Sequence, residues 1–230
     1  MFVAIAVLAG TAGAAAGLPA GTYVTEGGWG TMILQPEAGD RQPFAIESVG
    51  ANAHVCSVQG AVRNGLATVP TTSGDPACKV RFQPKGGGIE VSITDAQRTA
   101  CQHFCGARAA FDGTYLALPA ACERAAMDKR FKAAYRARQY AQAQAAIEPF
   151  VRDCARFTDW AALASLRNDL AITRFHLGDL AGCRKALEPL REYADASDDA
   201  LKQKYPPTDA DTAIDIAQAT RFNWRKCAAR

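Results

Sequence analysis

Two thiols and an imidazole lie close together in this sequence. Segment 101–105 reads CQHFC, so His103 stands between Cys101 and Cys105. A cysteine beside a histidine can act as a nucleophile, and two nearby cysteines can form a redox centre. The segment lacks the C-x2-C spacing and the thioredoxin context that lower a thiol pKa. We therefore expect both thiols to be oxidised and inert, and a thiol oxidoreductase using Cys101 and Cys105 is an alternative function.

Carboxylates are the other candidate for chemistry, because a hydrolase that cleaves cell-wall glycans needs a pair of them. Aspartates cluster at positions 195, 198 and 199 and again at 209, 211 and 215. Both clusters lie at or beside expected helix ends, where exposed capping charge is the ordinary role. The first cluster lacks the loop glycine and terminal glutamate of an EF-hand. No HExxH, GxSxG or P-loop motif occurs. We predict no catalytic, cofactor-binding or metal-binding residues and no enzymatic activity.

Cysteine usage indicates an oxidising compartment. The chain has an even number of cysteines, spread along its length: Cys56, Cys78, Cys101, Cys105, Cys122, Cys154, Cys183 and Cys227. An exported chain with this usage normally pairs them all. Zinc is the rival interpretation, but the C-x3-C segment stands alone, without a second pair of ligands. We predict four disulfides.

The first residues resemble an export signal. Phe2 to Leu8 form a short apolar run, small residues follow to Gly17, and the first 25 residues carry no charge. The pattern predicts a signal peptide at 1–16, and the run is too short for a stable membrane anchor. A buried N-terminal segment is the alternative. We expect a periplasmic or secreted protein, and the net charge of +3 does not indicate a nucleic-acid binder.

The first half of the chain, residues 20–118, has the pattern of short antiparallel strands. Glycine, threonine and valine are frequent, and Asn64-Gly65 and Asp112-Gly113 are turn signals. The expected strands are 22–25, 31–34, 44–49, 54–62, 67–69, 79–82, 88–93 and 114–118, with a helical turn near 96–104. This number of strands predicts a small β-barrel or sandwich.

The second half, residues 119–230, is alanine-rich with helical periodicity. Helices are expected at about 120–138, 141–155, 160–177, 180–195 and 209–228, the last capped by Thr208 or Asp209. Segment 137–150 (ARQYAQAQAAIEPF) recurs forty positions later as 177–190 (LGDLAGCRKALEPL). A fixed period of this size predicts stacked helical hairpins, and Pro149 and Pro189 predict a kink in each repeat. The fold class is therefore α+β.

Disulfide pairing follows in part from this plan. In a helical hairpin the start of the first helix lies beside the end of the second. Cys122 and Cys154 can therefore meet, and so can Cys183 and Cys227 across the fourth and fifth helices. By elimination, the β-half is left with Cys56–Cys78 and Cys101–Cys105. Each bond is expected to stabilise the fold by roughly 2–4 kcal/mol.

The helical half resembles the tetratricopeptide repeat family over residues 121–190. The motif residues lie at 138–140 and 145–146 in the first repeat, and at 170–171, 177–181 and 186–187 in the second. The period is 40 residues where the family has 34, and Gln139 stands where glycine or aspartate is usual. The resemblance implies stacked hairpins with a concave peptide groove.

The β-half is similar to small periplasmic barrels that inhibit lysozymes. It shares their export and cysteine linkage, and Gly-x-Tyr occurs at 21–23 and 113–115. This similarity implies an inhibitor or immunity partner of a wall-active hydrolase.

We expect an exported module that binds another protein, as such an inhibitor or as an envelope assembly factor. Trp29, which is flanked by glycines, is a candidate contact residue; packing in the core is the alternative. Arg167 and Asn168 interrupt an apolar helix face and could bind a peptide carboxylate and backbone; ordinary helix-surface polarity is the alternative. A small-ligand carrier with its site in the barrel is a further alternative.

Overall fold

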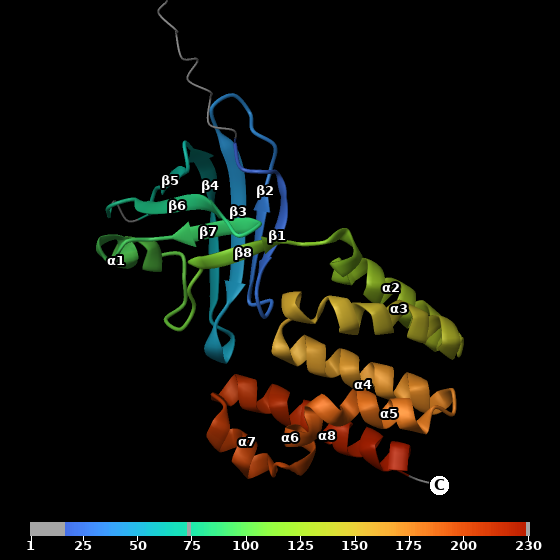
Figure 1. Ribbon diagram of the computed structural model, residues 1–230. Coiled ribbons are helices and arrows are strands. Elements are labelled where there is room, and N and C mark those ends of the chain that lie inside the picture. Colours follow the sequence, from blue (N-terminus) through green and yellow to red (C-terminus); the bar gives the residue numbers. More distant parts are fainter. Residues whose placement is uncertain (1–16, 73–74, 229–230) are drawn as a thin grey trace, which may run out of the picture.

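The computed structural model describes residues 17–72 and 75–228 of the chain. The predicted signal peptide at 1–16 lies outside this part. An N-terminal β-barrel is followed by a C-terminal array of helices, so the predicted α+β class is confirmed (Figure 1). None of the helices in the described ranges is long and apolar enough to cross a membrane.

All eight predicted strands form, and they close into a barrel. The strands are β1 (Gly21–Thr25), β2 (Gly30–Leu34), β3 (Gln42–Val49), β4 (Val55–Arg63), β5 (Leu66–Val69), β6 (Cys78–Lys85), β7 (Gly88–Ser92) and β8 (Gly113–Ala117). Each strand pairs antiparallel with the next, and β8 returns to β1. The expected choice between barrel and sandwich is thus settled as a closed barrel.

Side-chain alternation explains the barrel. In β6, Val80 and Phe82 are buried inside, whereas Lys79 and Arg81 are exposed outside. Period-two alternation of this kind places one face of a strand in a core and the other in solvent. The interior is filled by large side chains, among them Phe44, which packs on Phe82 with ring centroids 4.8 Å apart.

The barrel disulfides differ from the prediction. Cys56 is bonded to Cys105 and Cys78 to Cys101, so the predicted pairs Cys56–Cys78 and Cys101–Cys105 are wrong. Helix α1 (Arg98–Gln102) brings Cys101 to β6, and the residues after it run beside β4, where Cys105 forms a bridge with Cys56. A segment that lies between two strands presents one cysteine to each of them.

The helical half contains more helices than expected. They are α2 (Arg124–Arg136), α3 (Tyr140–Asp153), α4 (Trp160–His176), α5 (Leu180–Leu187), α6 (Arg191–Asp195), α7 (Asp198–Lys204) and α8 (Pro207–Ala228). The helix predicted at 180–195 is divided into α5 and α6 by a 3-10 turn that contains Pro189, and α7 was not predicted. Pro149 stays inside α3, so the two repeats respond differently to their prolines.

The repeat is visible in the turns between paired helices. Arg138 joins α2 to α3 and has a φ of 56°, and Gly178, forty positions later, joins α4 to α5 with a φ of 77°. A left-handed residue of this kind commonly ends a helix. The predicted Cys122–Cys154 and Cys183–Cys227 disulfides are confirmed, and α8 packs along α4, α5, α6 and α7.

Candidate partner-binding site

The CQHFC segment does not assemble a thiol centre. Cys101 and Cys105 are bonded to different strands, and no cysteine is free. His103 is turned toward a carboxylate, with its Nε2 3.2 Å from Asp75 Oδ2. The redox disulfide between Cys101 and Cys105 that an oxidoreductase would use is therefore not formed in this structure. In the described ranges, no three histidine, cysteine or acidic side chains gather in a way that could hold a metal ion.

Trp29 lies partly buried against its own barrel. Its indole packs beside Gly113, where a Cβ atom would come within 3.2 Å of the ring, and its centroid is 6.3 Å from that of Tyr115. Its carbonyl accepts a hydrogen bond from the Val49 amide at 2.8 Å. The side chain thus packs as part of the barrel. The turn that carries it, between β1 and β2, contacts the helical half.

The first contact between the two halves is made by the turn between β1 and β2. The Gly27 amide donates to the Arg156 carbonyl at 2.7 Å. Gly28, with a φ of 67°, lies so close to the connection between α3 and α4 that a Cβ would meet the Asp159 amide nitrogen, and would come within 2.8 Å of the Phe157 carbonyl oxygen. Only glycine combines this left-handed conformation with so close a backbone approach.

The second contact is a helix cap supplied by the barrel. Asn52, in the turn between β3 and β4, accepts a hydrogen bond on its Oδ1 from the Thr208 amide at 3.0 Å. The Asn52 amide in return donates to Asp209 Oδ2 at 2.9 Å. A capping box has this reciprocal pattern, normally within one segment. Here the cap of α8 comes from a residue about 156 positions away, so neither Thr208 nor Asp209 caps the helix alone as predicted.

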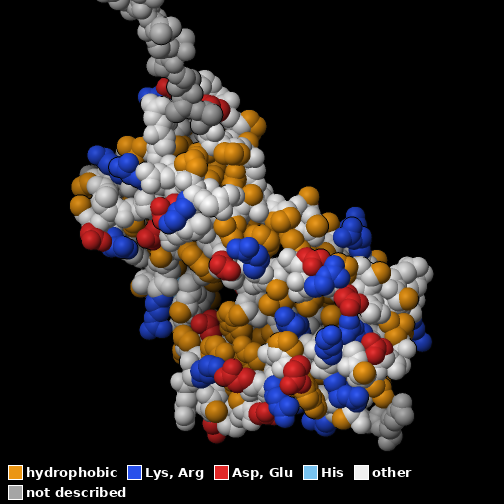
Figure 2. Space-filling view, viewed as in Figure 1, with side chains coloured by type: hydrophobic (Ala, Val, Ile, Leu, Met, Phe, Trp, Pro, Cys, Tyr) orange, Lys and Arg blue, Asp and Glu red, His pale blue; other side chains and the backbone are white. Residues whose placement is uncertain are grey.

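Exposed apolar side chains lie next to both contacts. Val49 and Val55 face each other across the β3–β4 hairpin that carries Asn52, and both are exposed. Trp160 follows Asp159 in sequence, is 40% exposed, and stacks on Tyr205 with centroids 5.4 Å apart. Figure 2 shows hydrophobic side chains bordering a hollow between the barrel and the helices. We define Val49, Val55 and Trp160 as the junction site.

Asn168 is buried and lies outside any groove. Its Nδ2 donates to the Ala164 carbonyl at 3.2 Å and to Thr220 Oγ1 at 3.0 Å, and its Oδ1 accepts from Asn223 Nδ2 at 3.0 Å. These bonds join α4 to α8 in the core. The proposed peptide-binding role of Asn168 is therefore corrected: its side-chain groups are already engaged by its own chain.

Arg167 stays accessible on α4. Its side chain is partly exposed, and burial of the remainder lowers the pKa of the guanidinium. Within the described residues, no carboxylate lies within ion-pairing distance of it. The structure thus separates Arg167 from Asn168, because adjacent residues of a helix point about 100° apart. Arg167 remains compatible with a carboxylate contact, which stays a prediction.

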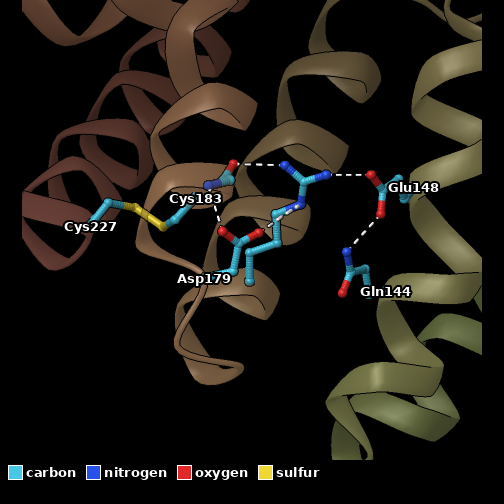
Figure 3. A network of polar contacts seen from close by, with 7 residues as sticks. Gln144, Glu148, Asp179, Cys183 and Cys227 are labelled. Atoms are coloured by element: carbon cyan, nitrogen blue, oxygen red, sulfur yellow. Dashed lines mark hydrogen bonds and ion pairs between the residues drawn. A yellow bond between two sulfur atoms is a disulfide. The ribbon is translucent and has the colours of Figure 1, made fainter.

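A polar network fixes the two helical hairpins relative to each other (Figure 3). Arg174 on α4 contacts Glu148 Oε1 on α3 and donates to the Gly182 carbonyl on α5 at 2.9 Å. Gln144 Nε2 holds the second Glu148 oxygen at 2.7 Å. Arg174 Nε is buried without a hydrogen bond among the described residues and lies 4.0 Å from Asp179 Oδ2. This network joins α3, α4 and α5 at the end of α4 that is remote from Trp160.

Asp169 is a partly buried carboxylate between α2 and α4. Burial is the main reason why its pKa is raised to about 6, the charge of Asp128 adds to the shift, and Lys132 and Arg124 oppose it. Because the folded pKa exceeds that of the unfolded chain, the stabilisation that protonated Asp169 provides is complete below about pH 4 and is lost as the pH rises through about 6.

Asp169→Asn is therefore expected to stabilise the fold at pH 7 by about 1–3 kcal/mol and to change little at pH 3.5. Urea unfolding of both proteins at the two pH values measures this. Asp95→Asn, at a largely exposed carboxylate of the barrel, is the control and should show no such difference. An equal effect of Asp169→Asn at both pH values would contradict the burial argument.

Comparisons with protein-family models, with curated proteins and with solved structures found no match. Asn52, Val49 and Trp160 were not predicted from the sequence. Trp160 carried the one usable signal, an aromatic residue directly after an N-capping aspartate, whose Oδ1 accepts from the Ala162 amide at 2.9 Å.

Proposed function

We propose that this chain is an exported, non-enzymatic module that binds another protein at the junction site. The observation that carries the proposal is the hydrogen-bonded connection of barrel and helices at two separate contacts, with exposed apolar side chains from both halves beside them. Interfaces are formed most readily by such pre-organised surfaces, in which aromatic side chains act as anchors.

Export is supported by the covalent structure. Four disulfides connect all eight cysteines, which is typical of proteins that fold in an oxidising compartment. Within that compartment, we propose that the partner is a wall-active hydrolase that the module inhibits or neutralises, or a component of an envelope assembly. The lysozyme-inhibitor and tetratricopeptide similarities of the sequence favour these two roles.

The alternative of a small-ligand carrier is less well supported. Large buried side chains, including Met32, Phe44, Phe82 and Tyr115, fill the barrel interior. A recess beside Phe111 and the barrel disulfides has a volume of about 60 Å³. Ligand pockets are usually at least about 300 Å³.

Site-specific photo-crosslinking tests the proposal. Benzoylphenylalanine would replace Val49 or Trp160 in the mature, oxidised chain, which is then irradiated in an envelope extract of the source organism. Leu177 is the matched control, because it is similarly exposed at 41% but follows the far end of α4. It lies about 25 Å along the helix from Trp160.

The expected result is one adduct of the same mass from Val49 and from Trp160, suppressed by an excess of the unlabelled chain and absent from the Leu177 variant. Adducts that are equally strong at all three positions, or no adduct at either junction position, would contradict binding at this site.

A further inference from the structure

Basic residues gather on the outer face of the barrel. Arg63 on β4 and Arg81 on β6 are both cross-strand neighbours of Leu66 on β5, and all three side chains point outward. Adjacent strands lie about 4.8 Å apart, so the two arginine backbones are about 10 Å apart with Leu66 between them. Lys79 stands two residues before Arg81 on the same face. Arg41 reaches this surface from the turn before β3 and, with Arg63 and Leu66, lines a shallow cavity of about 370 Å³.

We call Arg41, Arg63, Lys79, Arg81 and Leu66 the basic face. Residues 17–118 carry seven lysines and arginines and eight acidic residues, so the barrel half as a whole is not basic. Four of its seven cations are nevertheless on this one face. This segregation produces a local positive potential that the net charge conceals.

The cations of this face are poorly neutralised. Asp40 ion-pairs with Arg63 at 2.8 Å and lies 3.9 Å from Arg41. In the described part of the chain, no carboxylate lies within ion-pairing distance of Lys79 or Arg81. Leu66 at the centre is 42% exposed. An exposed apolar centre beside two cations without a carboxylate partner and two arginines that share one carboxylate has the composition of a protein interface, in which arginine is enriched.

We propose that the basic face is a second docking surface, and that it binds an acidic segment of a protein through carboxylates on the cations and an apolar side chain on Leu66. The inference rests on the proposed function only in taking the ligand to be a protein. Figure 1 places β5 and β6 on the side of the barrel away from helices α2 to α8, so this surface and the junction site can be occupied independently. Charge complementarity of this kind mainly increases the association rate and selects the partner.

A defined probe tests the inference on the full oxidised chain. The probe is a fluorescent ten-residue peptide of glutamates with two leucines, and binding is followed by anisotropy at about 0.05 M and 0.5 M salt. The test variant is Lys79→Glu with Arg81→Glu, at two exposed positions without ion pairs. The control is Lys129→Glu with Lys185→Glu on the helical half, which changes the net charge equally at two exposed positions that make no ion pair with any described residue. Leu66→Ala examines the apolar centre.

The wild type and the control should bind the peptide alike, with affinity that falls at least tenfold at the higher salt because screening shortens the range of exposed charges. The Lys79→Glu, Arg81→Glu variant should lose at least tenfold in affinity, and Leu66→Ala about threefold. Equal losses in the test and control variants, or no binding at low salt, would overturn the inference.

A parallel measurement uses vesicles that contain anionic phospholipid. Binding of vesicles but not of the peptide, lost in Lys79→Glu with Arg81→Glu, would assign the face to lipid headgroups and overturn the inference as well. Junction crosslinks in the wild type would remain in either case if the proposed function is correct. If only the peptide measurement fails, docking at the basic face is refuted, whereas partner binding at the junction site is not.

Discussion

Alanine at position 28 is expected to separate the barrel from the helical half. Gly28 has a left-handed φ of 67°, which destabilises any other residue by about 1–2 kcal/mol. Its new Cβ would also overlap the backbone of the α3–α4 connection, coming within 2.6 Å of the Thr158 carbonyl carbon. Overpacking of this kind typically adds about 1–3 kcal/mol, so we expect a total loss of about 2–5 kcal/mol.

Gly27→Ala is the matched control. Gly27 is also left-handed, with a φ of 79°, but a Cβ there would meet only the Trp29 side chain at 3.9 Å. It should therefore show the conformational penalty alone and keep its hydrogen bond to the Arg156 carbonyl. Urea unfolding gives the difference in stability. Hydrogen exchange at 154–159 shows whether the contact has opened, and equal behaviour of the two variants would refute the close-approach argument.

Local patterns were sufficient to predict the elements of the fold. Strand-favouring composition between turn signals predicted all eight strands, and in β6 and β7 period-two alternation supported the prediction, because those strands expose one face to solvent and bury the other in the core. The forty-residue repeat predicted the hairpins, and the left-handed positions Arg138 and Gly178 show that it reflects real structural equivalence. The helical disulfides followed from the same plan, since both ends of a helical hairpin are determined by local sequence.

Contacts between distant segments could not be predicted. The cap of α8 comes from Asn52, and nothing in the sequence around either residue indicates the other. The barrel disulfides were mispaired for the same reason, because the path of α1 between β4 and β6 depends on the closed barrel. Asn168 was misplaced because a polar residue on an apolar helix face is compatible with a groove, and also with the buried network to Thr220 and Asn223.

The Cys183–Cys227 disulfide should contribute strongly to stability. It joins the start of α5 to the end of α8 and closes a loop of 44 residues. Loop closure of this length restricts the unfolded chain enough to stabilise the fold by about 3–4 kcal/mol. The bond also holds the last turn of α8, where Arg184 Nη1 donates to the Cys227 carbonyl at 3.0 Å. Cys183→Ala with Cys227→Ala is therefore expected to lower the free energy of unfolding by this amount and to release the last turn.

The part of α8 that opens distinguishes release of its last turn from a general loss of stability. The N-terminus of α8 keeps its cap from Asn52, so hydrogen exchange should increase at 222–228 and remain slow at 210–217. The comparison is Cys122→Ala with Cys154→Ala, which removes the bond of the first hairpin and should lower stability by a similar amount without exposing the end of α8. Uniform acceleration along α8 in the first variant would mean that the disulfide, and not the contact with the barrel, sets the position of the whole helix.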